Sequence, residues 1–238
     1  HWGILKREVF IFIWALISLL TTLYLFGLFH FPHEVKHKIK LPRKTIGLIF
    51  MCFTLYLING LLTKENNLKL LSGFPPPIFY SLNESKKECP LNLECNKNFF
   101  DGQKIAKNTN KPILIDFTGW ACVNCRRMEE NVWSDPEVFK ILNNEIVLVS
   151  LYVDDRNELL EENKFSIKRL NGSIKNIKTI GQKWSTFQYL NFKTASQPFY
   201  VLITFDGEIL NEPIQYADKT AFKKWLNKGL KNYNKNSK

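Results

Sequence analysis

Two long apolar stretches come first in the chain. Val9–Phe29 and Thr45–Thr63 contain 21 and 19 residues with no charged side chain. A helix rises 1.5 Å per residue, so about 20 residues cross the roughly 30 Å hydrocarbon core of a bilayer. Neither stretch has a polar face, which argues against a buried helical hairpin in a soluble protein. We therefore expect residues 1–70 to form two transmembrane helices, at about 9–29 and 45–63.

The segment between these stretches, residues 30–44, is basic. Against the single acidic residue Glu34 it carries five basic residues: Lys36, Lys38, Lys40, Arg43 and Lys44. The outer flanks carry fewer, namely Lys6 and Arg7 on one side and Lys64 and Lys69 on the other. Cytoplasmic loops hold the excess of Lys and Arg. The loop is therefore expected in the cytoplasm, and everything after residue 64 on the outer side of the membrane.

Residues 71–97 read as a linker. Phe74-Pro75-Pro76-Pro77 predicts a short, stiff and extended spacer. Cys89 and Cys95 follow, and the five residues between them suffice to close a small loop. We expect these two cysteines to form a structural disulfide.

Residues 98–230 alternate between helical and strand patterns. Short apolar runs rich in β-branched residues predict strands, and amphipathic or capped segments predict helices. The expected helices are residues 98–108, 123–131, 134–142, 178–190 and 218–230. The expected strands are residues 112–117, 146–153, 199–205 and a short returning strand at 208–210. Residues 154–195 are otherwise a long polar insertion, and residues 231–238 are expected to be disordered.

This order of elements predicts an α/β domain. Strand, crossover helix and strand imply a parallel pair. The turn signal Asp206-Gly207 implies an antiparallel pair. The result is a mixed sheet flanked by helices, preceded by the two-helix transmembrane hairpin.

Composition narrows the class of partner. The net charge is +11, but the lysines after residue 70 are scattered rather than clustered on one face or motif, so we expect no nucleic-acid partner. Four of the five cysteines form two close pairs beyond the apolar stretches, which indicates an oxidising compartment. Because the chain begins at His1 rather than Met, we expect it to be part of a longer protein.

The chemistry is concentrated at Cys122 and Cys125. They stand where the strand at 112–117 hands over to a helix, and their spacing places both sulfurs on one face of its first turn. The unpaired N–H groups of a helix N-terminus favour thiolate over thiol. Cys122, nearer the helix end, is the expected nucleophile, and Cys125 is placed to attack the mixed disulfide.

Two other interpretations of these cysteines remain. Cys89, Cys95, Cys122 and Cys125 could bind zinc in a binding module, although Cys-x5-Cys matches zinc knuckles loosely. Alternatively Cys122–Cys125 could be an inert structural disulfide, although bridges that are strained and exposed tend to be labile. Cys52 stands alone in the second apolar stretch and is assigned no chemistry.

The segment Pro112–Met128, PILIDFTGWACVNCRRM, resembles the active-site segment of thioredoxin-fold proteins. Trp120 stands near the tryptophan usual in that family. Gln197-Pro198, followed by a strand, resembles the cis-proline that faces the CxxC. The resemblance implies that the Gln197–Pro198 bond is cis and that Trp120, Gln197 and Pro198 contact the protein substrate.

A closer resemblance is to the DsbD family of thiol:disulfide interchange proteins. Residues 133–142, WSDPEVFKIL, are typical of the last domain of that family, as are spanning helices followed directly by an outward-facing thioredoxin domain. Residues 1–70 look like the last two membrane helices and 98–230 like the C-terminal domain. The resemblance implies a protein-disulfide reductase of a bacterial inner membrane, with its redox domain in the periplasm.

The same resemblance implies partners. Electrons come from cytoplasmic thioredoxin, cross an upstream membrane redox domain of the same protein, and reach Cys122 and Cys125. They then pass to periplasmic thiol-disulfide proteins, among them disulfide isomerases and cytochrome c maturation factors. No cofactor is implied beyond the Cys122–Cys125 disulfide, and no metal. The family's membrane redox cysteines lie in earlier helices, so this chain is not expected to move electrons across a membrane by itself.

Two carboxylates carry over by position from the family. Asp116 lies six residues before Cys122, and Glu129 lies four after Cys125. In the family, acids at these places tune the cysteines. A nearby negative charge disfavours thiolate, and a buried carboxylate can accept the Cys125 proton. The redox potential would distinguish a reductase from the alternative of a dithiol oxidase or isomerase on the same fold.

Overall fold

The structure, a computed structural model, describes residues 5–31, 39–63, 68–76, 82, 89–168 and 172–236. It divides the chain into two compact units, residues 2–84 and 85–238. Parts of the expected cytoplasmic loop, linker and tail lie outside the described residues. Each unit is considered by itself below.

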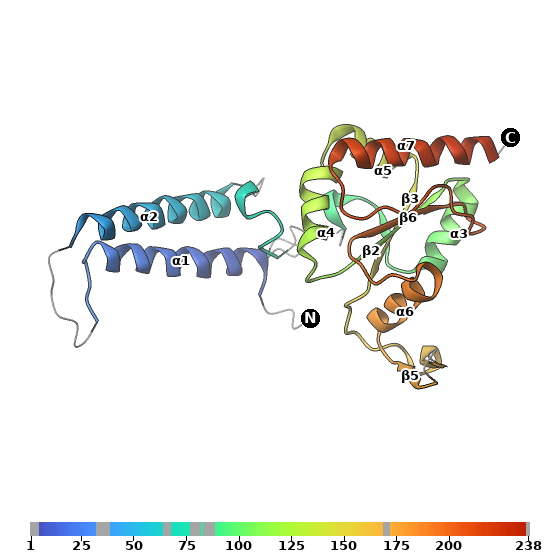
Figure 1. Ribbon diagram of the computed structural model, residues 1–238, viewed down its shortest axis with the longest axis horizontal. Helices are drawn as coiled ribbons and strands as arrows, with labels where there is room; N and C mark the ends of the chain where they lie inside the picture. Colours follow the sequence, from blue (N-terminus) through green and yellow to red (C-terminus); the bar gives the residue numbers. More distant parts are fainter. Residues whose placement is uncertain are drawn as a thin grey trace. The chain divides into compact units, whose positions relative to one another are not determined.

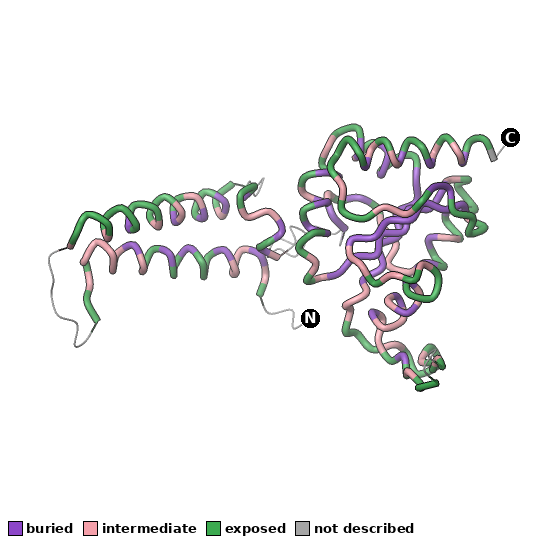
Figure 2. The backbone as a smooth tube through the Cα atoms, in the orientation of Figure 1, coloured by how far each residue is buried: buried purple, intermediate pink, exposed green. Residues whose placement is uncertain are grey.

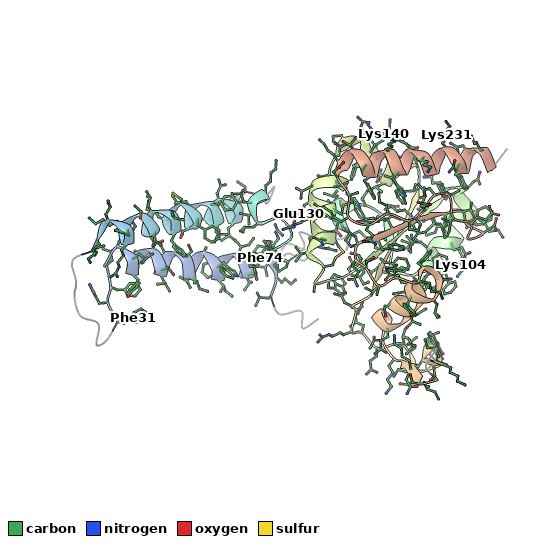
Figure 3. The ribbon with its side chains drawn as sticks, in the orientation of Figure 1. Phe31, Phe74, Lys104, Glu130, Lys140 and Lys231 are labelled. Carbon is green, nitrogen blue, oxygen red and sulfur yellow. A yellow bond between two sulfur atoms is a disulfide. The ribbon has the colours of Figure 1, made fainter. Side chains whose placement is uncertain are left out.

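The first unit is a helical hairpin. Helices α1 (Arg7–Leu25) and α2 (Leu41–Leu62) run antiparallel and side by side, followed by the 3-10 turn η1 (Lys69–Leu71) (Figure 1). Both helices are long and apolar enough to cross a membrane. Phe74 lies against this unit, with its ring centroid 5.4 Å from that of Phe10 and 5.6 Å from that of Trp14 (Figure 3).

The interface between α1 and α2 combines small and hydroxyl-bearing residues with a few apolar ones, whereas the outside of the hairpin is apolar. Thr54 Oγ1 donates to Ser18 Oγ at 2.8 Å between the helices. Buried and exposed positions recur along both helices (Figure 2). The buried ones are Arg7, Ile11, Ala15, Ser18 and Thr22 of α1 and Gly47, Thr54, Leu57 and Gly60 of α2. Large exposed side chains include Phe12, Leu16, Leu20, Leu48, Ile49 and Leu55. This is the reverse of the burial pattern expected of a water-soluble hairpin.

The second unit is built on a mixed sheet, which confirms the expected α/β class. Within the described residues the strand order is β1-β3-β2-β6, with β1/β3 and β2/β3 parallel and β2/β6 antiparallel. The strands are β1 (Cys95–Asn96), β2 (Ile113–Thr118), β3 (Val147–Tyr152) and β6 (Phe199–Ile203). All residues of β2, β3 and β6 are buried, as their apolar sequences predict.

Helices cover both faces of this sheet (Figure 1). On one face, α3 (Phe99–Thr109) and α6 (Ile180–Phe192) pack over a core that includes Ile115, Val149 and Val201. On the other face, a second core includes Leu114, Leu148 and Phe222. The elements over this second core are α4 (Val123–Met128), its π-helical continuation η3 (Glu129–Trp133), α5 (Pro136–Asn144) and α7 (Lys219–Asn236).

Local signals in the sequence explain several helix starts. Asp135 caps α5 by accepting from Glu137 N–H, and Pro136 occupies the first turn. Thr179 and Gln182 form a capping box at the start of α6. Asn98 caps α3 through the N–H of Phe100.

The boundaries expected from sequence need two corrections. Residues 89–97 are not linker, because η2 (Pro90–Asn92) and β1 belong to the second unit and Cys95 pairs with Leu148 of β3. Nor do residues 231–236 form a disordered tail, because α7 continues to Asn236. Tyr233 is 6% exposed, and its hydroxyl donates to Asn110 Oδ1 at 3.0 Å.

The insertion after β3 contains more structure than its polarity predicts. It includes the 3-10 turn η4 (Glu161–Asn163) and an antiparallel hairpin of β4 (Phe165–Lys168) and β5 (Ile174–Ile177). The expected returning strand at 208–210 is reduced to a single bridge between Ile203 and Ile209.

The C-terminal helix gives a first prediction. Tyr233→Phe should lower the free energy of unfolding by about 1 kcal/mol through loss of one hydrogen bond. Tyr233→Ala should lower it by about 3 kcal/mol, because a ring is also removed from the core. Urea unfolding of the full chain in mild detergent, followed by near-ultraviolet circular dichroism, measures both. Lys231→Ala, at an exposed position of the same helix, is the control. If Tyr233→Ala lowered the free energy of unfolding no more than Lys231→Ala does, the packing of Tyr233 described here would be contradicted.

Candidate active site

The Cys122–Cys125 pair lies at the start of α4, where β2 ends. The two cysteines form a disulfide, with their Cα atoms 5.3 Å apart. Cys122 is the N-cap residue, and its Sγ accepts from the N–H of Cys125 at 3.1 Å. Cys122 is partly exposed, whereas Cys125 is 1% exposed. An incoming molecule therefore reaches Cys122 first, which fits the roles of nucleophile and resolving cysteine expected from sequence.

Asp154, at the end of β3, holds the turn that precedes the cysteines. Its two carboxylate oxygens accept from the N–H groups of Trp120, at 2.8 Å, and Ala121, at 3.0 Å. Sequence reasoning missed this residue and assigned it to the insertion. The signal was its position: parallel β2 and β3 end at the same edge of the sheet, so a carboxylate just after β3 lies beside the turn after β2.

Gly119 brings the Gln197–Pro198 segment against the same turn. A Cβ atom on Gly119 would lie 2.8 Å from Gln197 Oε1 and 2.9 Å from Asp154 Oδ2, so a larger residue does not fit without a shift of these groups. The Gln197–Pro198 peptide bond is cis, as the resemblance predicts. Residues 75 or more positions apart in sequence thus meet at the active-site turn.

Trp120 is packed rather than free. Its ring stacks on Tyr152 with centroids 4.1 Å apart and planes inclined by 24°. The Lys97 ammonium lies 5.4 Å from the centroid of the Trp120 ring. Trp120 therefore covers the end of β3 and keeps part of its surface available for a contact.

Asp116 and Glu129 are both buried on the α4 side of the sheet, at 2% and 6% exposure. Ser150 Oγ donates to Asp116 Oδ2 at 3.3 Å. Glu129 Oε1 lies 2.7 Å from Arg126 Nη2. Burial raises the pKa of Asp116 to about 7 and that of Glu129 to about 8, while the charge of Arg126 lowers both. The pKa values of these two buried carboxyl groups therefore lie close to neutral pH.

Arg126 and Tyr152 are further members of this buried cluster that sequence reasoning did not single out. Arg126 directly follows Cys125, and its side chain is 3% exposed. Its Nη2 also donates to Thr118 Oγ1 at 3.1 Å. An arginine next to a CxxC reads as a solvated helix residue, and only the fold reveals its burial. Burial likewise raises the pKa of Tyr152.

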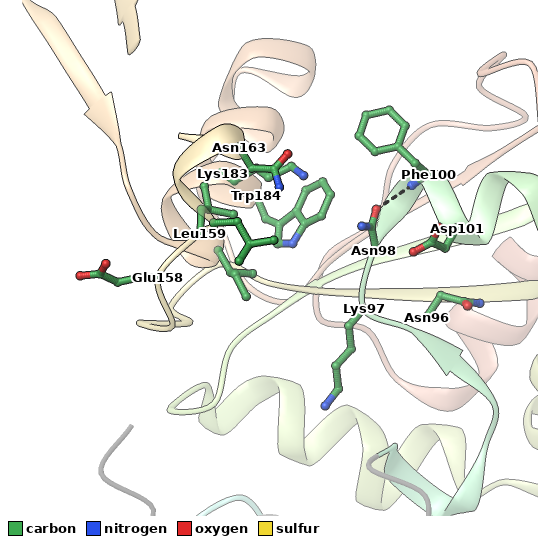
Figure 4. Close-up of a pocket in the computed structure, with 12 residues that line it drawn as sticks. Asn96, Lys97, Asn98, Phe100, Asp101, Glu158, Leu159, Asn163, Lys183 and Trp184 are labelled. Atoms are coloured by element: carbon green, nitrogen blue, oxygen red, sulfur yellow. Dashed lines mark hydrogen bonds between the residues drawn. The ribbon is translucent and has the colours of Figure 1, made fainter. Parts of the chain in front are cut away.

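A cavity of about 640 Å³ lies beside this site, between the starts of α3 and α6 and the loop before η4 (Figure 4). Its lining includes Phe100, Leu160 and Trp184. Lys183 covers its aromatic wall, with the ammonium 4.6 Å from the Trp184 ring centroid. Lys97 borders the cavity, but its side chain points away from it in Figure 4. The cavity is not formed by the cysteine pair, and we assign it no chemistry.

The other cysteines are separate from this site. Cys89 and Cys95 form a second disulfide, with Cα atoms 6.0 Å apart, and Cys89 is 7% exposed. Cys52 is a free, exposed thiol on α2. Within the part of the chain that the structure describes, no three His, Cys, Asp or Glu side chains gather as ligands for a metal. The four cysteines that the zinc-site interpretation requires are divided between two disulfides in this structure, so they do not form one set of ligands.

Comparison with known proteins identifies the family. A family model for the thioredoxin-like domain matches residues 99–230, more than half of the chain. The chain belongs to the thioredoxin-like domain family. Its second unit has a thioredoxin-like fold, with the Cys122–Cys125 disulfide at the position described above.

More specific relatives match weakly. Two proteins called thiol:disulfide interchange protein DsbD, from Campylobacter jejuni strains RM1221 and NCTC 11168, are each 24% identical over 143 residues. The match covers 59% of this chain and 23% of theirs, so the chain spans about a quarter of the length of these relatives.

Solved thioredoxin-like structures also match. A DsbH oxidoreductase is 19% identical, with a TM-score of 0.39, covering 63% of this chain and 93% of that one. A thioredoxin from Thermus thermophilus is 19% identical, with a TM-score of 0.40, covering 57% and 85%.

The buried carboxyls of this thioredoxin-like unit predict a pH-dependent stability. The folded-state pKa of Asp116 lies above its ordinary value of 3.8, at about 7. Folding therefore favours the protonated carboxyl, and this contribution, present in full below pH 4, is lost as the pH rises to 7. The side chain of the Asp116→Asn variant cannot ionise. Between pH 5 and 8 the free energy of unfolding of this variant should therefore fall less than that of the wild type, with a difference on the order of a few kcal/mol.

Denaturant unfolding of the full chain in detergent at several pH values measures this difference. Asp206→Asn, which changes an exposed carboxyl, should leave the pH dependence as in the wild type. Parallel pH profiles for wild type and Asp116→Asn would show that burial does not set the protonation of Asp116.

Proposed function

We propose that this protein is a protein-disulfide reductase that passes electrons from Cys122 and Cys125 to disulfides of partner proteins. The observation that carries the proposal is the asymmetry of the pair, with a partly exposed Cys122 at the helix start and a buried Cys125, in a thioredoxin-like fold whose Gln197–Pro198 bond is cis. The weak similarity to DsbD proteins supports the reducing direction.

The reaction consists of two thiol-disulfide exchanges. In the reduced protein, the Cys122 thiolate attacks one sulfur of the target disulfide, so that a mixed disulfide forms and one target thiolate leaves. The Cys125 thiol then loses its proton to a carboxylate, and its thiolate attacks Cys122 Sγ. The second target thiolate leaves, the Cys122–Cys125 disulfide closes, and two electrons have moved to the target.

The neighbours of the pair have separate roles in this proposal. Asp154 fixes the turn before Cys122 through two N–H groups. The segment at Gln197 and Pro198 offers backbone to an extended target as an added strand, and Trp120 supplies an apolar contact. Asp116 and Glu129 exchange protons with the cysteines.

We further propose that the hairpin of α1 and α2 is embedded in a bacterial inner membrane, with the thioredoxin-like unit in the periplasm. Close packing through small residues and hydroxyl groups, with large apolar side chains outside, is typical of membrane helices. The basic segment between the helices favours a cytoplasmic loop. An upstream membrane redox domain of the same protein would then reduce Cys122–Cys125, and periplasmic proteins, including cytochrome c maturation factors, would receive the electrons.

A dithiol oxidase or isomerase is the second candidate, because the same fold and pair serve both directions. The redox potential distinguishes the candidates. Equilibration with glutathione buffers should give a value near that of thioredoxin, about −270 mV, rather than about −120 mV as in dedicated oxidants.

The roles of the two cysteines give the third prediction. Cys122→Ser should abolish reduction of insulin by the full chain, because the nucleophile is lost. Cys125→Ser should instead accumulate mixed disulfides through Cys122, because the resolving thiol is absent. Non-reducing electrophoresis with mass mapping measures both. If Cys122→Ser traps partners and Cys125→Ser does not, the two roles are reversed.

The second disulfide gives the fourth prediction. Cys89 is buried, whereas Cys122 is partly exposed, and access limits the rate of thiol-disulfide exchange. Under mild reductant, Cys122–Cys125 should open first while Cys89–Cys95 stays intact through repeated turnover. Differential alkylation followed by mass mapping tests this. Free Cys89 and Cys95 thiols, or a Cys89–Cys122 bond during turnover, would show that the second pair takes part in exchange.

A further inference from the structure

Arg126 carries a buried charge that has no role in the two thiol-disulfide exchanges described above. A buried arginine is rare unless it is paired, and the side chain of Arg126 is 3% exposed. It stands directly after Cys125, whereas Arg127, the next residue, is exposed. The chain thus places two arginines in series and buries the one that adjoins the resolving cysteine.

The contacts of Arg126 join both elements that hold the cysteines. Its Nη2 lies 2.7 Å from Glu129 Oε1, one helical turn further along, and donates to Thr118 Oγ1 at 3.1 Å. The same atom lies 3.5 Å from the carbonyl oxygen of Gly119, in the turn before Cys122. The guanidinium therefore connects the end of β2 with the helix that carries both sulfurs.

Acidic and phenolic groups face Arg126 from every strand around it. Asp116 comes from β2, Tyr152 from β3 and Tyr200 from β6, while Glu129 lies on η3. Glu130, also on η3, acts on Glu129. Burial raises the pKa of Asp116, Glu129 and both tyrosines, and the charge of Arg126 lowers all four. Among these groups Arg126 is the one that favours ionised carboxyls.

We propose that Arg126 is a positioning residue that keeps a carboxylate of the Asp116–Glu129 pair ionised at neutral pH, ready to accept the proton of Cys125. This inference rests on the proposed reductase function. In the second exchange the Cys125 S–H bond breaks, its proton passes to the carboxylate, and the electron pair left on sulfur forms the bond to Cys122 Sγ. The bond between Cys122 Sγ and the target sulfur breaks, and the target thiolate leaves with the electron pair of that bond.

Three variants of the full chain test the proposal. Arg126→Met removes the charge and keeps an apolar stem, Arg126→Lys keeps the charge, and Arg127→Met removes a neighbouring exposed charge as the matched control. The reduced proteins, in mild detergent, are mixed with a disulfide-bonded peptide and quenched with acid at times that resolve formation and decay of the mixed disulfide. Each reaction is repeated from pH 5.5 to 9.

In Arg126→Met we expect decay of the mixed disulfide at pH 7 to slow by about tenfold or more, since each unit of pKa increase reduces the ionised carboxylate tenfold. The pH profile of this step should move upward by at least one unit. Arg126→Lys should recover most of the rate, and Arg127→Met should match the wild type. A lost rate without a shifted pH profile, or Arg126→Lys no better than Arg126→Met, would overturn the charge role.

A second measurement tests the charge without turnover. Carbon-13 NMR of Asp and Glu carboxyls in the oxidised full chain should show titrations near neutrality that move to higher pH in Arg126→Met and stay in Arg127→Met. Unmoved titrations overturn the proposal. If Arg126→Met does not fold, Arg126→Gln, which retains a donor for Thr118, is judged by the same criteria. A wild-type protein that does not reduce the peptide would refute the proposed function, and the carboxyl titration would still decide on Arg126.

Discussion

The parallel pairing of β2 with β3 is the constraint on which the site depends. In its register Asp116 lies opposite Ser150, and Thr118 lies opposite Tyr152. Both strands end at one edge, so the turn after β2 meets Asp154 just after β3. A shift of β2 by one residue along β3 would turn Asp116 toward the other face of the sheet, away from Ser150. The register of β2 on β3 therefore also places the polar groups of the site.

The same pairing places polar groups where the domain is otherwise apolar. The β2 side chains Leu114, Asp116 and Thr118 share one face of the sheet, above which α4 and η3 pack. Burying two carboxyls and a guanidinium on this face costs stability unless the groups are paired or neutralised. The structure pairs Glu129 with Arg126 and gives Asp116 a hydroxyl donor. The remaining cost appears as raised pKa values, which move proton exchange into the neutral range.

Sequence alone predicted the elements whose signals are local. The change from β2 to α4 and the start of α5 at Asp135-Pro136 follow from short motifs. The cis bond before Pro198 was predicted from the resemblance of Gln197-Pro198 to the cis-proline of thioredoxin-fold proteins. The two-residue strand β1 has no such signal, because it exists only through pairing with β3. The sequence between β4 and β5 does contain such a signal, the Asn171-Gly172 pair, which is typical of tight turns, but a two-residue signal inside a polar segment does not by itself predict a hairpin.

The site divides along the same line. The chemistry of Cys122 and Cys125 can be predicted from their position at a helix start. The burial of Arg126 cannot, because it depends on a β2 residue eight positions earlier, Thr118, and on packing beneath the sheet. The role of Asp154 requires knowing which strand lies beside β2. The role of such a residue depends on a neighbour in space, so it can be recognised only once the fold is known.

The two units of the chain bury opposite kinds of side chain, and this difference extends the argument to their surroundings. In the thioredoxin-like unit the large apolar residues are inside, as in water-soluble domains. In the hairpin, hydroxyls, glycines and a few apolar side chains such as Ile11 and Leu57 fill the interface, while many large Leu, Ile and Phe side chains lie outside. Lipid tails are as apolar as leucine, so in a bilayer the helices gain nothing by hiding leucines and associate through close packing and hydrogen bonds instead. One physical rule, that each surface matches its solvent, accounts for both patterns if the hairpin lies in lipid and the redox unit in water.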